Sequence, residues 1–327
     1  MSQAYRLGFE FSAPEESSTP DDARWSLAGV DPNARIRIGS FPASDGAAIP
    51  YRLWQAAAPR AFVLLLHGAC DYSGAFDEIG PMFAARGIAA LAIDQRGFGA
   101  TASRGKWRGK TRMIRDAVEA VMYLRKRYGD GLPVFILGES MGAALAVHVA
   151  SRAADLDLAG LVLSAPGAIS GAWRRMFGTV ITRVLRFFAP NAGIVVERIS
   201  AWDFTPAAAI RLLSDPMVMR RIRPAALFGL FKLSRSAVDE AEHVRVPVLT
   251  MVGTKEDVLR LDCIRRLYDG LAGDKDWQTF EDGPHLLLHW QHNDRVLGKV
   301  FSWLETRLTD ISAAYKIEAA NDTIRAT

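Results

Sequence analysis

The pentapeptide Gly138-Glu139-Ser140-Met141-Gly142 is the first place where residue type and spacing point to chemistry. It follows the apolar run 134–137 and precedes a helix-like run over residues 143–154. Strand, sharp turn and helix are the context of a nucleophile elbow, which exposes a serine hydroxyl above a sheet. The alternative is a glycine-rich turn in which Ser140 only caps the helix. The context favours the elbow.

A serine hydroxyl needs a base to remove its proton, and the base needs an acid to orient it. In folds that carry such an elbow, the acid and then the histidine follow the serine, each in a loop after a strand. The run 248–252 leads into Gly253-Thr-Lys-Glu-Asp257, and the run 277–280 leads into Glu281-Asp-Gly-Pro-His285. We therefore expect Ser140, an acid from the first loop (Glu256 or Asp257) and His285 to form a catalytic triad.

The other five histidines fit the role of base less well. His148 lies eight residues along the elbow helix, and His243 falls in a charged linker. His289 and His292 follow the His285 loop, where we expect them to pack or to lie at the surface. His67 precedes Ser140 in the chain, and we expect its side chain to be buried and hydrogen-bonded.

Backbone N–H groups near two strand ends are candidates for an oxyanion hole. His67-Gly68-Ala69 ends the run 62–66 at the same edge of the sheet as the elbow. The sequence predicts the N–H groups of Ala69 and Met141 as the two donors that hold a tetrahedral oxyanion. Cys70 lacks the elbow geometry, and we expect it to be a small buried residue rather than a nucleophile.

This chemistry requires no metal and no cofactor. Gly97-Phe-Gly99-Ala-Thr-Ala102 loosely matches the dinucleotide-binding fingerprint and follows a strand. That fingerprint must open a helix directly, and the residues that follow do not. We therefore expect neither nicotinamide nor flavin binding.

The elements that must position these residues alternate between strands and helices. Short continuous apolar runs are typical of strands buried on both faces of a parallel sheet; they lie at residues 62–66, 88–93, 134–137, 158–163 and 248–252. Amphipathic stretches of helix length lie between them, at residues 76–86, 111–127, 140–154 and 261–271. Residues 36–38 and 49–54 form a predicted hairpin around Asp45-Gly46. The pattern predicts an α/β protein with a mostly parallel, doubly wound sheet.

Residues 168–240 break this alternation. No clear strand is visible there, and four prolines divide the segment into short pieces rich in Phe, Trp, Met and Arg. We interpret it as an all-helical cap inserted into the core. The expected organisation is an irregular lead-in at 1–34, an α/β core at 35–167 and 241–309, the helical cap at 168–240, and a C-terminal tail at 310–327 that begins as a short helix and ends loosely.

Composition and charge bound the setting of the protein. The 327 residues are 50% hydrophobic and 23% charged, which is ordinary for a globular chain. Two cysteines make no disulfide framework, and no secretory signal or membrane-length apolar run is visible, so a cytoplasmic protein is expected. Residues 168–240 hold eleven Lys and Arg against five Asp and Glu, a net +6, whereas the whole chain carries +4. This basic segment is either a solvated helix face or a contact with an anionic membrane surface.

Nucleic acid is not expected as a partner, because no recognition motif is present. Apolar side chains within the insertion would either line an acyl-chain tunnel or form the insertion's own core; they are Trp173, Met176, Phe177, Phe187, Phe188, Trp202, Met217, Met219, Phe228 and Phe231. The expected partner is a small-molecule substrate.

Several motifs together resemble the monoglyceride lipase and lysophospholipase branch of the α/β-hydrolase superfamily. They are His67-Gly-Ala-Cys-Asp-Tyr-Ser-Gly-Ala-Phe76, Asp94-Gln-Arg-Gly-Phe-Gly-Ala100, Gly138-Glu-Ser-Met-Gly142, Leu213-Ser-Asp-Pro-Met217 and His285-Leu-Leu-Leu288. The resemblance spans roughly residues 40–308. It implies the α/β-hydrolase fold with a helical cap and a serine esterase that acts on a lipid-like ester, such as a monoacylglycerol or lysophospholipid. It also implies Ser140 as nucleophile, His285 as base, and Ala69 with Met141 as oxyanion donors.

The acid departs from the family pattern. The branch has Gly-x-x-Asp-x-Val after the strand, and this chain has Gly253-Thr-Lys-Glu256-Asp257-Val258. Register points to Glu256, whereas residue type points to Asp257. Ser-His-Glu triads occur in this fold, and we favour Glu256 with Asp257 as the alternative.

Three functions remain open at this point. We favour a serine hydrolase that cleaves carboxylic esters through an acyl-enzyme. A thioesterase or an acyltransferase would use the same triad on another bond or with another acceptor. A non-catalytic binding protein of the same fold would result if the displaced acid leaves the site inert.

Overall fold

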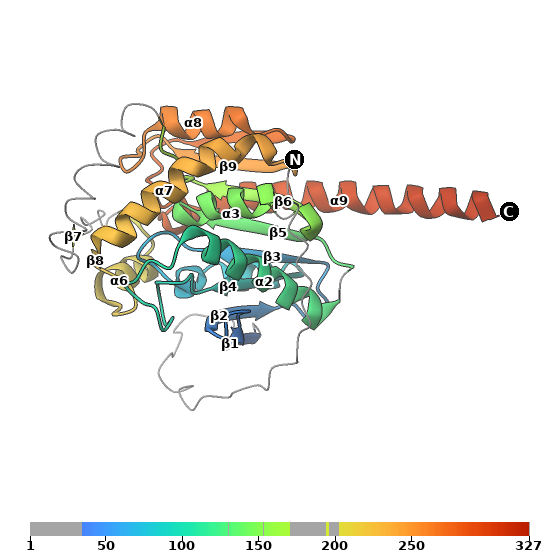
Figure 1. The fold of residues 1–327 in the computed structure, drawn as a ribbon. Helices are drawn as coiled ribbons and strands as arrows, with labels where there is room; N and C mark the ends of the chain where they lie inside the picture. The colour runs from blue at the N-terminus through green and yellow to red at the C-terminus, as the bar shows by residue number, and fades with distance from the viewer. Residues whose placement is uncertain (1–34, 130, 153, 171–193, 196–202, 327) are drawn as a thin grey trace, which may run out of the picture.

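A sheet of eight strands runs through the molecule (Figure 1). The computed structural model describes residues 35–129, 131–152, 154–170, 194–195 and 203–326. The strand order is β1-β2-β4-β3-β5-β6-β9-β10. Strand β2 pairs antiparallel with both β1 and β4, and every other pairing in the sheet is parallel. The predicted mostly parallel sheet is confirmed.

The central strands are buried on both faces. Every residue of β3 (Ala61–Leu66), β4 (Ile88–Ile93), β5 (Val134–Glu139) and β9 (Val248–Gly253) is buried, and β6 (Leu158–Ser164) is nearly so. This is why their sequences are continuous apolar runs rather than alternating ones. The flanking strands are β1 (Arg35–Pro42) and β2 (Ala48–Gln55), which form the predicted hairpin, and β10 (Lys275–Phe280).

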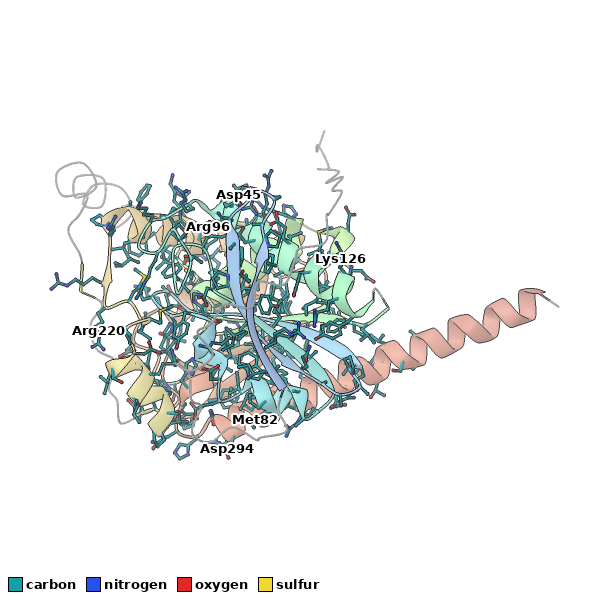
Figure 2. All side chains as sticks on the ribbon, turned by 90° about the horizontal axis from the view of Figure 1, so that it is seen from below. Asp45, Met82, Arg96, Lys126, Arg220 and Asp294 are labelled. Carbon is teal, nitrogen blue, oxygen red and sulfur yellow. The ribbon has the colours of Figure 1, made fainter. Side chains whose placement is uncertain are left out.

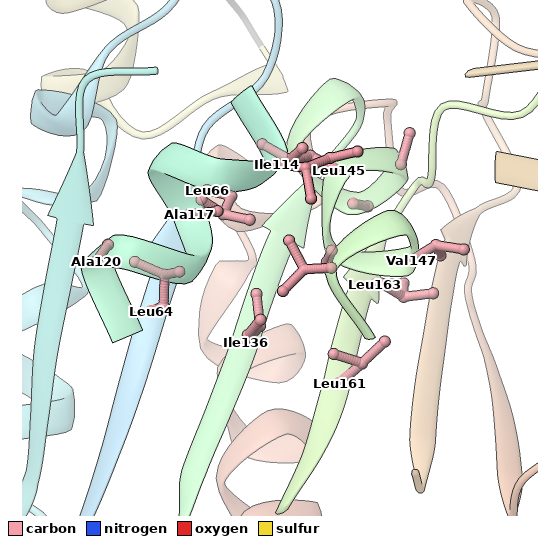
Figure 3. Close-up of a cluster of buried hydrophobic side chains, with 14 of the residues drawn as sticks. Leu64, Leu66, Ile114, Ala117, Ala120, Ile136, Leu145, Val147, Leu161 and Leu163 are labelled. Atoms are coloured by element: carbon pink, nitrogen blue, oxygen red, sulfur yellow. The ribbon is translucent and has the colours of Figure 1, made fainter. Parts of the chain in front are cut away.

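Helices cover both faces of this sheet and make a three-layer core. One face packs against α2 (Lys110–Tyr128), α3 (Met141–Arg152) and α8 (Leu261–Gly270), as the cluster in Figure 3 illustrates for α2 and α3. The other face packs against η1 (Ser73–Phe76), α1 (Gly80–Ala84) and α9 (Asn293–Ala326). Since the side chains of a strand alternate between faces, β3 sends Leu64 and Leu66 to the first layer and Val63 and Leu65 to the second.

The turn between β1 and β2 is tied to the core by charge. Arg96 forms two hydrogen bonds to Asp45, of 2.9 and 3.0 Å, and two to the buried Asp116, of 2.8 and 2.9 Å. Figure 2 shows Asp45 and Arg96 side by side. Asp94, two residues earlier, accepts backbone N–H groups from Ser73 at 2.8 Å and Ala100 at 2.7 Å. Arg96 and Asp94 therefore hold loops in place, as the sequence predicted.

The insertion contains strands as well as helices. Helices α6 (Pro206–Ser214) and α7 (Pro224–Glu240) occupy most of its described part, but β7 (Ile194–Val195) pairs antiparallel with β8 (Arg221–Ile222). The expectation of an all-helical insertion is therefore wrong in this detail. Residues 171–193 and 196–202 of the expected cap lie outside the described residues.

The C-terminal segment also differs from expectation. Helix α9 continues to Ala326, so the predicted short helix with a loose end is wrong. The sequence after Gly298 contains no further glycine or proline and is rich in alanine, which favours an uninterrupted helix. Figure 1 shows its last turns projecting away from the body of the molecule. Within the described ranges, no helix combines the length and apolarity that crossing a membrane requires.

Burial at the sheet centre predicts that two isoleucines contribute very differently to the free energy of unfolding. Ile136 on β5 is fully buried beneath α2 and α3, whereas Ile38 on β1 is 49% exposed. We expect Ile136→Ala to lower the free energy of unfolding by about 2–5 kcal/mol, because it removes packed methylenes and leaves a cavity. Ile38→Ala should cost less than about 1 kcal/mol. Urea unfolding of the two variants measures this, and equal losses would contradict the assigned packing.

Candidate active site

The serine sits on a strained turn at the end of a central strand. Ser140 has φ = 51°, in the left-handed region that residues other than glycine rarely adopt. Its backbone N–H donates to the Ser164 carbonyl at 2.9 Å, and its own carbonyl accepts from Gly167 at 2.9 Å and Ala144 at 3.1 Å. These bonds hold the strained residue in place. Helix α3 begins at the next residue, so Ser140 lies at the positive end of a helix dipole.

The two glycines of the motif allow this turn by the absence of a side chain. A Cβ on Gly142 would overlap the carbonyl oxygen of Leu66 at the end of β3, and a Cβ on Gly138 would overlap the backbone of Gly142. The backbones of β3, β5 and α3 thus meet without intervening side chains. The structure therefore has the geometry expected of a nucleophile elbow.

His285 bridges the serine and an acid. It lies in the loop after β10, and its side chain is only 6% exposed. Its Nε2 lies 3.0 Å from Ser140 Oγ, and its Nδ1 lies 2.6 Å from Glu256 Oε2. A carboxylate only accepts hydrogen bonds, so the Nδ1 proton points to Glu256 and Nε2 accepts the serine proton. This is the tautomer that a general base for Ser140 requires.

The acid in contact with His285 is Glu256 rather than Asp257. The Glu256 carboxylate is fully buried, and its second oxygen, Oε1, accepts the backbone N–H groups of Val258 at 2.9 Å and Leu259 at 2.8 Å. Glu256 thus takes part in three hydrogen bonds, which hold both of its carboxylate oxygens in place. Asp257, the next residue, is exposed to solvent. The extra methylene of a glutamate lets the side chain reach His285 from the register position.

Backbone bonds join the acid loop to the histidine loop. Thr254 N–H donates to the Phe280 carbonyl at 2.9 Å, and Lys255 N–H donates to the Gly283 carbonyl at 3.0 Å. Both loops follow neighbouring parallel strands, β9 and β10. This pairing fixes the distance between Glu256 and His285, since each residue lies one or two positions beyond a bonded one.

The predicted oxyanion donors belong to the residue after the serine and to the loop after β3. Met141 follows Ser140 as the first residue of α3. Gly68, the neighbour of Ala69, lies close to Ser140: a Cβ built on Gly68 would be 3.7 Å from the Cβ of Ser140. Among the described residues, no backbone acceptor takes the N–H of Ala69 or of Met141. Neither amide is therefore committed to a backbone partner, and both remain candidate donors for a substrate oxygen.

The neighbours of Ala69 have structural roles, as the sequence predicted. His67 is fully buried; its Nε2 accepts the Gln95 N–H at 3.0 Å and its Nδ1 donates to the Gly68 carbonyl at 2.7 Å. Burial lowers the pKa of His67 below its ordinary value, which keeps the ring neutral. Cys70 is buried, and burial raises the pKa of its thiol to about 12. A thiol in this state does not act as a nucleophile.

Sequence reasoning missed a buried contact behind the elbow. Glu139, the variable residue before Ser140, is 2% exposed and its Oε2 lies 3.1 Å from Nε2 of His289. Its Oε1 accepts the backbone N–H of Leu288 at 3.2 Å. Glu139 therefore connects the serine turn to η6 (Leu287–His289), just after His285. The only signal in the sequence was an acid inside the motif and a histidine four positions after His285.

The fold and this arrangement of serine, histidine and acid define an α/β-hydrolase. The profile of the family described as "Serine aminopeptidase, S33" matches residues 57–291. The chain belongs to this family.

Similar proteins carry lipase names. A monoacylglycerol lipase of Mycolicibacterium smegmatis is 28% identical over 82% of this chain and 97% of its own. The phospholipase YtpA of Bacillus subtilis is 30% identical over 74% of this chain and 94% of its own. A crystal structure of a soluble variant of monoglyceride lipase from Saccharomyces cerevisiae superposes with a TM-score of 0.70 at 19% identity, over 84% of this chain and 96% of that one. The last comparison supports the fold.

Two helical glycines test the close approach at the elbow. We expect Gly142→Ala to abolish hydrolysis of p-nitrophenyl esters and to destabilise the fold, because the new methyl group would displace the Leu66 carbonyl. Gly298→Ala, in α9, meets no atom within 4 Å and should leave activity unchanged while stabilising the protein by up to about 1 kcal/mol. Thermal unfolding and ester hydrolysis of both variants provide the measurement. An active Gly142→Ala enzyme would show that the turn can form without this contact.

Proposed function

We propose that the protein is a serine hydrolase that cleaves carboxylic esters of lipid-like substrates through an acyl-enzyme intermediate. In this proposal Ser140 is the nucleophile, His285 the general base, and Glu256 the orienting acid. The N–H groups of Ala69 and Met141 are the oxyanion donors. The observation that carries the proposal is the position of His285, with one ring nitrogen on Ser140 Oγ and the other on the buried Glu256.

The first half-reaction forms the acyl-enzyme. His285 Nε2 accepts the hydroxyl proton as Ser140 Oγ attacks the ester carbonyl, and the carbonyl electrons move onto oxygen. The Ala69 and Met141 amides stabilise that oxyanion, and Glu256 stabilises the imidazolium. The tetrahedral intermediate then collapses, the ester C–O bond breaks, and His285 gives its proton to the departing alcohol.

The second half-reaction returns the enzyme to its starting state. His285 removes a proton from water, whose oxygen attacks the acyl-serine carbonyl through a second tetrahedral intermediate. Collapse releases the carboxylic acid, and the proton on His285 returns to Ser140 Oγ. Every proton is carried by His285, so the reaction needs no metal ion and no cofactor.

The substrate class rests on the relatives. Proteins that align with most of this chain are named monoacylglycerol lipase and phospholipase, which supports a lipid ester. The family description instead names an aminopeptidase, so an aminoacyl amide is the comparison substrate. The proposed acyl tunnel falls mostly outside the described residues: of the apolar side chains expected to line it, only Met217, Met219, Phe228 and Phe231 are described.

Substitution of the two acids separates their roles. We expect Ser140→Ala to lower kcat on p-nitrophenyl esters by about 10⁴-fold or more. Glu256→Gln should lower kcat by about 10²–10⁴-fold, because the amide no longer stabilises the imidazolium. The matched variant Asp257→Asn, one residue away on the exposed side of the loop, should stay within about twofold of the wild type. Stopped assays across acyl lengths from acetate to palmitate give these values.

Four outcomes would contradict the proposal. A larger loss of kcat in Asp257→Asn than in Glu256→Gln would assign the role of triad acid to Asp257. Faster release of nitroaniline from alanine p-nitroanilide than of nitrophenol from any ester would favour a peptidase. A wild-type protein that neither hydrolyses esters or thioesters nor reacts with a fluorophosphonate would favour the non-catalytic alternative. Alkyl esters formed in the presence of an added alcohol would identify an acyltransferase.

The location we propose is the cytoplasm, with contact to an anionic membrane surface. The two cysteines are unpaired, which fits a reducing compartment. We define the cap patch as Ile210, Leu213, Arg220, Arg221 and Arg223, all exposed. Arg220 donates to the Leu213 carbonyl, and Figure 2 shows it at the periphery of the molecule, so basic and apolar side chains adjoin there. Such a surface binds anionic lipids, with about 1 kcal/mol for each basic residue near the membrane.

Sedimentation with vesicles tests this contact. We expect the protein to bind vesicles of phosphatidylglycerol and phosphatidylcholine more tightly than vesicles of phosphatidylcholine alone. Arg220→Gln/Arg221→Gln should weaken the binding about tenfold or more. Arg265→Gln/Arg266→Gln removes the same charge from two adjacent exposed arginines on α8 and should have little effect. Equal effects of the two pairs would mean that net charge, rather than the cap patch, governs binding.

A further inference from the structure

Three consecutive residues of the loop after β3 are each bonded to one short stretch of the insertion. The Cys70 carbonyl accepts the Met219 N–H at 2.7 Å. The next residue, Asp71, forms an ion pair with Arg211. The Tyr72 hydroxyl donates to the Asp215 carboxylate at 2.6 Å. We call residues 211–219 the clamp segment; they include the end of α6 and the turn that follows it.

The clamp segment itself is held in shape by local bonds. Asp215 also accepts the backbone N–H of Met217 at 2.7 Å, while its own N–H donates to the Arg211 carbonyl at 3.0 Å. Asp215 belongs to the motif Leu213-Ser-Asp-Pro-Met217, to which the triad chemistry assigns no role. Its carboxylate thus does two things: it closes the turn after α6, and it binds the loop after β3.

The ion pair within this contact is buried. The side chains of Arg211 and Asp71 are 11% and 10% exposed, so each charge depends on the other. Burial disfavours the charge of Asp71, but Arg211 and His289 favour it more, and the pKa of this carboxyl is lowered from its ordinary value. Burial likewise opposes the charge of Arg211, yet Asp71 raises the pKa of the guanidinium. The pair is charged in the folded protein.

Ala69 lies between two fixed points of the same loop. On one side, His67 is held by Gln95, which donates its N–H to the ring at 3.0 Å and its amide to the His67 carbonyl at 2.6 Å. On the other side, Cys70 has φ = 69°, a conformation that persists only where neighbouring contacts impose it. The contacts that hold it are the turn bond from the Asp71 N–H to the Gly68 carbonyl, at 3.4 Å, and the bonds to the clamp segment. The direction of the Ala69 N–H is therefore set partly by the insertion.

We propose that Arg211 and Asp215 are positioning residues for the oxyanion hole: by holding Asp71 and Tyr72, they keep the Ala69 N–H directed at the oxygen of the tetrahedral intermediate. This inference rests on the proposed serine hydrolase function. Neither residue contacts substrate in this role. The role appears in the tetrahedral intermediates and the transition states that flank them, because the oxyanion develops only there.

The first test measures kcat and KM separately for Arg211→Ala on p-nitrophenyl butyrate. Loss of a whole oxyanion donor costs about 10²–10³-fold, so a misdirected donor should lower kcat by about 10–100-fold with KM nearly unchanged. Tyr72→Phe, which removes one hydroxyl, should lower kcat in the same way but less. The control is Arg104→Ala: Arg104 donates to the Pro216 and Met217 carbonyls of the same segment, and among the described residues it forms no hydrogen bond or ion pair with residues 69–72.

A trifluoromethyl ketone separates positioning from general loosening of the site. Its adduct with Ser140 places a charged oxygen in the oxyanion hole, whereas a neutral alcohol of matched chain length, such as 1-hexanol, carries no charged oxygen. We expect Arg211→Ala to weaken inhibition by the ketone by the same factor by which kcat/KM falls, while inhibition by the alcohol is unchanged. Added guanidinium at millimolar concentration should restore part of kcat.

Stability is measured alongside, because Arg211→Ala leaves Asp71 buried without its partner. The double variant Arg211→Met/Asp71→Leu removes both charges, and apolar replacement of a buried pair is often tolerated. We expect this variant to recover Tm without recovering kcat, and Arg211→Lys to recover part of both. If Arg211→Ala does not fold, the double variant and Tyr72→Phe decide the question.

The outcomes distinguish this inference from the proposed function. If wild-type protein hydrolyses no ester, the proposed function fails and the assay says so before any clamp variant is made. If the wild type is active but the clamp variants match Arg104→Ala in kcat and in ketone inhibition, the positioning role is wrong. Recovery of kcat together with Tm in the double variant would also overturn it, since stability alone would then explain the loss.

Discussion

The close approach of backbones beneath Ser140 is the constraint on which the rest of the site depends. Gly142 lies against the Leu66 carbonyl, and this contact brings the end of β3 next to the start of α3. Met141 begins α3 and Ala69 follows the end of β3 by three residues, so this approach brings the two proposed oxyanion donors to the same edge of the sheet. Strain at Ser140 is maintained by backbone bonds to Ser164 and Gly167. A site assembled from rigid backbone in this way is positioned before any substrate binds.

Burial of charge is the second organising feature. Glu256, Glu139 and Asp71 are all buried close to the strand ends, where an unpaired carboxylate would be costly. Each carboxylate has different partners. Glu256 accepts two backbone N–H groups and bonds to a histidine, and Asp71 pairs with an arginine from the insertion. Glu139 accepts a backbone N–H and lies 3.1 Å from His289 Nε2. Buried pairs contribute little net stability, but removal of one member is expensive. The main effect of these buried pairs is therefore to fix the conformation of each loop, since few other loop conformations would keep the carboxylate paired.

Features that depend on residues close together in the sequence were predicted, whereas contacts between residues far apart in the sequence were not. The central strands and the helices α2, α3 and α8 were predicted because burial on two faces or on one stripe leaves a local periodicity. Ser140 and His285 were predicted to meet, and the structure brings them together; each lies in a loop after a strand that has a local signal, and their order along the chain is that of the fold. The partner of Asp71 lies 140 positions away in a segment without periodic pattern, and no local signal connects the two. His289 was expected to pack or to lie at the surface; its burial depends on Glu139, 150 positions earlier, so its contact with the elbow was not visible from the histidine itself.

The acid position shows why register can outweigh residue type. Asp257 has the shorter side chain that this fold commonly uses, but a loop fixes where each backbone position points. Thr254 is bonded to the end of β10, and Lys255 is bonded to the histidine loop. These two bonds fix the chain immediately before position 256, so position 256 faces His285 and position 257 faces solvent. A glutamate at 256 then reaches the ring with one additional methylene, and the Val258 and Leu259 amides hold its second oxygen in place. The backbone thus determines which position supplies the triad acid, and the longer side chain of glutamate spans the distance from that position to His285.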